Sequence, residues 1–149
     1  MVDGNGNKIK ANSSTIQGDL NEAKGNNLVI QGSQNLLSGD NSKIIGSENW
    51  LVGNDNLVLG NKNEASGSKN SIEGEQNKVG GTSNNITGRV NEVLGSQNTI
   101  KGDINKVLGD FNNIFGSENK VAGNDNSILG SINVVKGSEN SIKGNENLV

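Results

Sequence analysis

The chain has no cysteine, histidine, tyrosine or proline, and its 149 residues include one tryptophan, one methionine and two phenylalanines. Without cysteine, no disulfide can stabilise the fold, and the sequence does not reveal the redox compartment. Without histidine, cysteine or tyrosine, the usual pairs of nucleophile and base cannot be assembled. We therefore expect neither an enzyme nor catalytic residues.

Strong charge of either sign and long apolar runs are also missing. The net charge is −3 and the isoelectric point about 4.9, which provides no basic surface for nucleic acid. No apolar stretch has the length of a membrane span, and Met1-Val2-Asp3-Gly4 does not resemble a secretion signal. We expect no nucleic-acid partner and no membrane insertion.

What the sequence does have is a seven-residue repeat. Glycine recurs at every seventh position from Gly4 to Gly144, and Ala11 is the only departure. An asparagine follows three residues after each glycine and an aliphatic residue two positions later, so the unit is Gly-[Ser/Asn/Asp]-x-Asn-x-[Ile/Val/Leu]-x. The asparagine is replaced at Ser14, Leu28 and Ser42. A repeat of this kind determines the architecture.

The repeat does not predict a coiled coil, which needs two apolar positions in every seven and helix-forming residues between them. A glycine in each heptad would cost a helix roughly 1 kcal/mol. In an extended segment, by contrast, the asparagine, the aliphatic residue and the glycine lie on one face. Each heptad therefore predicts a short strand followed by a tight corner, at which glycine permits positive φ.

Two heptads make a coil of 14 residues in which the aliphatic side chains of opposed strands meet in a thin seam. A triangular coil of 21 residues is the alternative. The predicted seam includes Ile44, Leu51, Val58, Ile100, Val107 and Ile114. We expect a single all-β solenoid domain over residues 1–149, with about ten and a half coils and a length of roughly 50 Å at ~4.8 Å per coil.

The inward asparagines would be costly to bury unless their amides were paired. In a stack of coils each amide lies one strand spacing from the next, so the amides can form a continuous hydrogen-bonded ladder. β-Rolls that bind calcium use a nine-residue Gly/Asp unit, and the unit here has seven residues with asparagine. We expect no metal and no cofactor.

The repeat, as in Gly53-Asn54-Asp55-Asn56-Leu57-Val58, resembles that of the grass proteins that inhibit ice recrystallisation, and the resemblance covers essentially the whole chain. It implies a left-handed β-roll with inward asparagine ladders, and an ice surface as the partner. Ice binding needs a flat face with short outward residues. The candidates are Thr15, Ser71, Thr87, Thr99 and Ser127.

Outward apolar residues suggest a different role. A contiguous exposed apolar patch usually marks a contact surface. We expect such a lateral patch at Ile45, Trp50, Val52, Leu57, Leu59 and Phe115.

The terminal coils follow the repeat without a polar cap, and an open terminal coil is an unpaired β edge. The sequence-based hypothesis is thus a structural protomer that stacks head to tail with copies of itself into a filament or extracellular surface fibre; the alternative is an ice-binding protein. Such a fibre would lie outside the cell or at its surface. The end-to-end contacts would involve Val2, Asn147, Leu148 and Val149.

Overall fold

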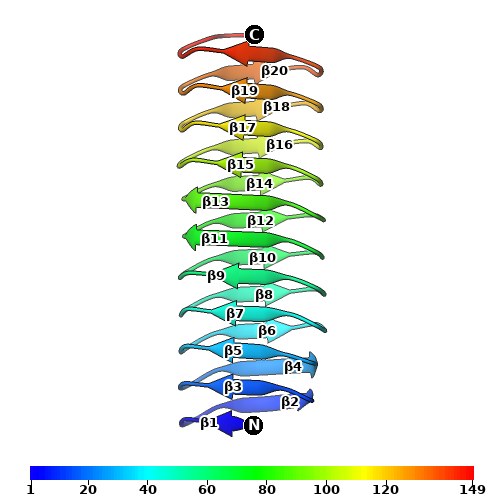
Figure 1. Ribbon diagram of the computed structural model, residues 1–149, viewed down its shortest axis with the longest axis vertical. Helices are drawn as coiled ribbons and strands as arrows, with labels where there is room; N and C mark the ends of the chain where they lie inside the picture. Colours follow the sequence, from blue (N-terminus) through cyan, green and yellow to red (C-terminus); the bar gives the residue numbers. More distant parts are fainter.

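The computed structural model describes residues 1–149 as a rod of short strands wound into stacked coils, with the two termini at opposite ends (Figure 1). Odd-numbered strands form an 11-stranded parallel sheet, here called sheet A, and even-numbered strands form a 10-stranded parallel sheet, sheet B. Sheet A consists of β1 (Val2–Asp3), β3 (Thr15–Gln17), β5 (Val29–Gln31), β7 (Lys43–Ile45), β9 (Leu57–Leu59), β11 (Ser71–Glu75), β13 (Asn85–Arg89), β15 (Thr99–Lys101), β17 (Asn113–Phe115), β19 (Ser127–Leu129) and β21 (Ser141–Lys143). Sheet B consists of β2 (Lys8–Asn12), β4 (Glu22–Asn26), β6 (Leu36–Ser38), β8 (Trp50–Val52), β10 (Glu64–Ser66), β12 (Lys78–Gly80), β14 (Glu92–Leu94), β16 (Lys106–Leu108), β18 (Lys120–Ala122) and β20 (Val134–Lys136).

Each strand pairs in parallel with the strand two places along the chain, and the register advances by 14 residues. Ile86 of β13, for example, lies opposite Ile100 of β15. The predicted 14-residue coil is confirmed, and the 21-residue alternative is excluded. The left-handed winding implied by the resemblance stays a prediction.

The aliphatic residue of each heptad fills the seam between the two sheets. The core comprises 20 buried apolar residues, including all six of the predicted seam residues named above. Leu28, which stands in an asparagine position, is also fully buried. Burying such a side chain contributes about 1.5–3 kcal/mol, so the narrow seam is the main apolar source of stability.

The predicted asparagine ladder is also confirmed, and Asn105 shows its geometry. Its Nδ2 donates to Oδ1 of Asn91 in the preceding coil at 3.0 Å and to the carbonyl oxygen of Gly116 at 2.9 Å. Its Oδ1 accepts bonds from the backbone N–H and the Nδ2 of Asn119 in the following coil. Both amide hydrogens and both lone pairs are used, and no buried polar side-chain atom lacks a partner.

The corners add a second ladder, built from the residue that follows each glycine. The backbone N–H of Asp110 donates to Oδ1 of Asn124 one coil further on at 2.8 Å, and that of Ser117 donates to the hydroxyl of Ser131 at 3.1 Å. The next residue in every corner has positive φ; at 20 positions it is not glycine. Those residues include β-branched Val90, for which this left-handed conformation is unusual.

Candidate functional site

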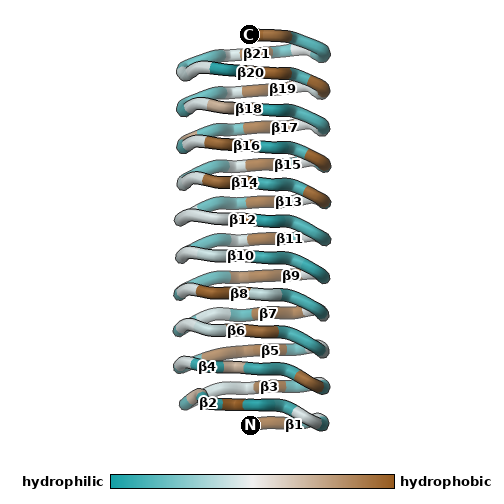
Figure 2. The backbone as a smooth tube through the Cα atoms, turned by 180° about the vertical axis from the view of Figure 1, so that it is seen from behind, coloured by the Kyte–Doolittle hydropathy of each residue, from teal (hydrophilic) through white to brown (hydrophobic).

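The rod has two broad outer faces, one on each sheet; sheet A is in front in Figure 1 and sheet B in Figure 2. On each strand the residues on either side of the buried aliphatic one point outward, because side chains alternate along a strand. Residues 14 apart are aligned by the register. Each face therefore carries two straight rows of side chains that run along the rod.

Four of the five predicted ice-binding residues lie in one row of sheet A: Thr15, Ser71, Thr99 and Ser127. Thr87 lies in the neighbouring row. Between Ser71 and the C-terminal end, this row contains only short uncharged polar residues. We call it the short polar row: Ser71, Asn85, Thr99, Asn113, Ser127 and Ser141.

The sequence-based selection missed three members of this row, Asn85, Asn113 and Ser141, because it considered hydroxyl residues alone. Spacing by 14 residues would have found them. Thr15 stands apart from the row, since Val29, Lys43 and Leu57 come between it and Ser71.

Sheet A is also the smoother face. The rod has four surface depressions, two on sheet B and two at the corners that lead from sheet A into sheet B. None is centred on the outer face of sheet A. Sheet B is rougher because long charged side chains stand in one of its rows, with ion pairs between coils at Lys78–Glu64 (3.2 Å) and Lys106–Glu92 (2.8 Å).

The family model of the grass antifreeze β-roll matches residues 1–88, which is more than half of the chain. The chain belongs to this family. A comparison with curated proteins finds no match. The repeat of the β-roll continues unchanged beyond Gly88, so most of the short polar row lies outside the matched segment.

The β-roll divides the predicted lateral patch between its two faces, which corrects the expectation of one contiguous surface. Trp50 and Val52 lie in β8 of sheet B, whereas Ile45, Leu57 and Leu59 lie in β7 and β9 of sheet A. Consecutive heptads alternate between the sheets, so residues close in sequence face opposite directions. Phe115, in β17, is separated from β9 by three intervening strands of sheet A.

The residues predicted to make end-to-end contacts lie in the terminal coils. Val2 pairs with Ile16, and the N–H of Val149 donates to the carbonyl oxygen of Val134 at 2.9 Å. Asn147 continues the ladder, with its Nδ2 2.8 Å from Oδ1 of Asn133. Leu148 forms a bridge with Val134 and is 82% exposed.

Acidic side chains do not gather into a metal site anywhere in the β-roll: no group of three converges. The structure also has no helix with the length and apolar character required to cross a membrane. The features left to consider for function are the two faces, the corners and the ends.

Proposed function

We propose that the protein binds ice through the outer face of sheet A and slows the recrystallisation of ice. The observation that carries the proposal is the short polar row, which runs over six consecutive strands of the smoother face. Membership of the grass antifreeze β-roll family supports the same activity.

A row of equivalent groups suits a periodic surface better than a discrete ligand. Small-molecule sites are concave and surround their ligand, whereas sheet A offers short hydroxyl and amide groups repeated at one strand spacing. Such groups can hydrogen-bond to ordered water, directly or through bridging waters. Many weak contacts on one plane would add up to tight adsorption.

The rigidity of the roll supports this role because binding loses less free energy when the surface is already ordered. Thr99 illustrates this, since its N–H donates to the carbonyl oxygen of Asn112 at 2.8 Å. Asn112 is itself held in the ladder by Asn98. The face is thus anchored from behind through backbone and amide hydrogen bonds.

The test is an ice-recrystallisation assay with the variant Thr99→Tyr and its control Ser66→Tyr. Both replace an exposed residue on a strand, where tyrosine is well accepted, but Ser66 lies on sheet B. A ring that projects from sheet A would hold neighbouring groups off the ice. Thr99→Tyr should therefore require about tenfold more protein for the same inhibition, equivalent to roughly 1.4 kcal/mol of lost adsorption, while Ser66→Tyr should behave as wild type.

Normal coarsening of ice grains with the wild-type protein would reject ice binding altogether. Equal loss in both variants would reject sheet A as the ice-binding face. Since ice that threatens tissue grows outside cells, the proposed activity favours an extracellular or cell-surface location.

End-to-end association into a structural fibre is a second candidate function, supported by the polarity of the asparagine ladder. Every rung donates toward the preceding coil, so Asn140 and Asn147 have free Oδ1 acceptors while the amide of Asn7 has a free hydrogen. A second copy placed on Val149 would bring these complementary groups together and cover Val2, Leu148 and Val149. The outward apolar residues, namely Ile45, Leu57, Leu59 and Phe115 on sheet A and Trp50 and Val52 on sheet B, would then contact neighbouring rods on both sides.

Electron microscopy of the purified chain tests this candidate. Fibres should form, and the double variant Val2→Lys with Val149→Lys should leave the coils folded but stop their growth, because charge at an edge blocks strand addition. Separate rods about 50 Å long, monomeric by light scattering at high concentration, would exclude it without bearing on ice binding.

A further inference from the structure

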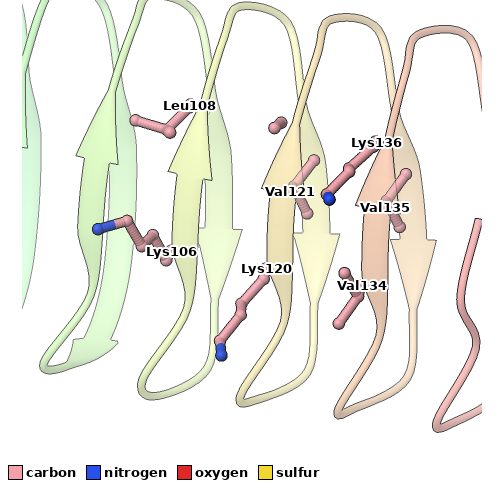
Figure 3. A pocket seen from close by; sticks show the side chains of 8 residues that line it. Lys106, Leu108, Lys120, Val121, Val134, Val135 and Lys136 are labelled. Carbon is pink, nitrogen blue, oxygen red and sulfur yellow. The ribbon is translucent and has the colours of Figure 1, made fainter.

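Near the C-terminal end of sheet B, a shallow apolar depression is bordered by lysines (Figure 3). It spans β16, β18 and β20 and has a volume of ≈ 200 Å³. It arises because Ala122 is short and stands in its row between Leu108 and Lys136. The methyl groups of Ala122 and Val134, together with Leu108, present an apolar surface to solvent, while Val121 and Val135 lie beneath.

The charge around this depression is positive, against the net charge of −3 of the whole chain. Lys106 and Lys120 are adjacent in one row, and such like charges on neighbouring strands repel each other. Lys106 is neutralised by Glu92 at 2.8 Å. Lys120 and Lys136 take part in none of the four ion pairs of the protein, although Glu118, Asp125 and Glu139 lie in the adjoining corners.

The three lysines are also oriented differently (Figure 3). Lys106 extends away from the depression, toward the side on which Glu92 lies. Lys136 reaches back from its own strand toward the preceding one, so its ammonium group is next to the apolar surface. Lys120 borders the same surface from the other row. Two ammonium groups without a partner thus flank one patch of methyl groups.

From this combination we propose that the depression binds an amphipathic anion: a single-chain carboxylate whose headgroup is held by Lys136 and Lys120. The aliphatic part of the ligand lies over Ala122, between Leu108 and Val134. Neither feature suffices alone, since an exposed lysine pair binds anions weakly and the depression is too open to retain a neutral hydrocarbon. Together they supply charge-assisted hydrogen bonds and apolar contact to one molecule.

Titration of the ¹⁵N-labelled full chain with octanoate, followed by amide chemical shifts, tests the proposal. Octanoate should cause saturable shifts confined to β16, β18 and β20, at roughly millimolar concentration because the site is shallow. Octanol and octylammonium, which carry the same chain without the negative charge, should cause much smaller shifts.

Two pairs of variants separate the charge from the apolar surface. Lys136→Gln should weaken octanoate binding by about tenfold, the loss expected from one charge-assisted contact, whereas Lys24→Gln, in the same row at the other end of sheet B, should have no effect. Ala122→Leu fills the depression and should also abolish binding while leaving the lysines in place. Its control is Ser66→Leu, again in the same row. Leu94 and Leu108 already occupy this row, so the fold should accept both changes.

Shifts that do not saturate, or that octylammonium reproduces, would overturn the proposal. So would unchanged octanoate binding by Ala122→Leu. Binding to vesicles of anionic phospholipid without any effect of octanoate would indicate electrostatic attraction to a lipid surface instead, and this also contradicts a site for a single molecule.

Discussion

A methyl group added to Gly109 would collide with the backbone carbonyl oxygen of Gly123 in the next coil. The same relationship holds for nearly every lattice glycine, since the corners of successive coils approach too closely to leave room for a Cβ. Glycine is thus needed at these positions for two reasons, its positive φ and the close contact between coils.

The two reasons can be separated by mutation. Gly109→Ala should lower the free energy of unfolding by roughly 2–5 kcal/mol, through strain at φ +131 and overpacking against Gly123. Gly137→Ala is the matched control: its φ is +132, but the nearest atom to the added Cβ is Nδ2 of Asn140 at 3.6 Å. Urea unfolding followed by circular dichroism should show a clearly smaller loss for Gly137→Ala. Equal losses would mean that contact between coils is not limiting.

The asparagine ladder makes a second prediction. Asn105→Ala removes the acceptor for two donors of Asn119 and the amide donor to Gly116. Because each orphaned buried group costs about 1–3 kcal/mol, we expect a loss of roughly 3 kcal/mol or more. Asn113→Ala, which truncates an exposed asparagine without side-chain hydrogen bonds, should change stability by less than about 0.5 kcal/mol. Similar urea midpoints for the two variants would contradict a structural role for the ladder.

Most of the fold could be predicted because one heptad states every requirement of the coil. The glycine marks the corner, the asparagine the ladder and the aliphatic residue the seam, and the spacing of 14 residues determines which side chains stack. Ser14, Leu28 and Ser42 interrupt one ladder near the N-terminal end, and the structure absorbs them locally: the N–H of Leu28 donates to the hydroxyl of Ser14, and that of Asn56 to the hydroxyl of Ser42.

The corners were harder to predict, because the residue with positive φ is often not one that favours a turn. Lys62, Val90, Ile104 and Phe111 all adopt this conformation, although none is glycine, asparagine or aspartate. The conformation is imposed by the closure of the coil, which local propensity does not reveal. The lateral patch failed for a simpler reason: Trp50 and Leu57 are one heptad apart, and one heptad reverses the face.

The corner conformation predicts a stabilising substitution. Ile104 has φ 61 and an exposed side chain, so a β-branched residue is strained there without gaining burial. Ile104→Asn should raise the free energy of unfolding by about 1 kcal/mol, because asparagine tolerates the left-handed region. The reciprocal change Ser83→Ile, at φ 59 in an equivalent corner, should lower it by a similar amount. Urea midpoints that move in the opposite directions would show that contacts of Ile104, and not its backbone, determine its contribution.

The alternation of heptads between faces allows the ice-binding face to be tested without changing any side chain. Deletion of 92–105 removes one whole coil, so every remaining residue keeps its sheet and the short polar row loses only Thr99. Deletion of 92–98 removes one heptad and shifts everything after it to the opposite sheet. The seam and both ladders are preserved in either case, because both sheets obey the same repeat. The row, however, is then split, with Ser71 and Asn85 on one face and its other four members on the other. Circular dichroism should show both variants folded. Inhibition of ice recrystallisation should be nearly retained after the 14-residue deletion and largely lost after the seven-residue deletion, because adsorption requires one continuous face. Equal activity of the two folded variants would mean that the row on sheet A does not bind ice.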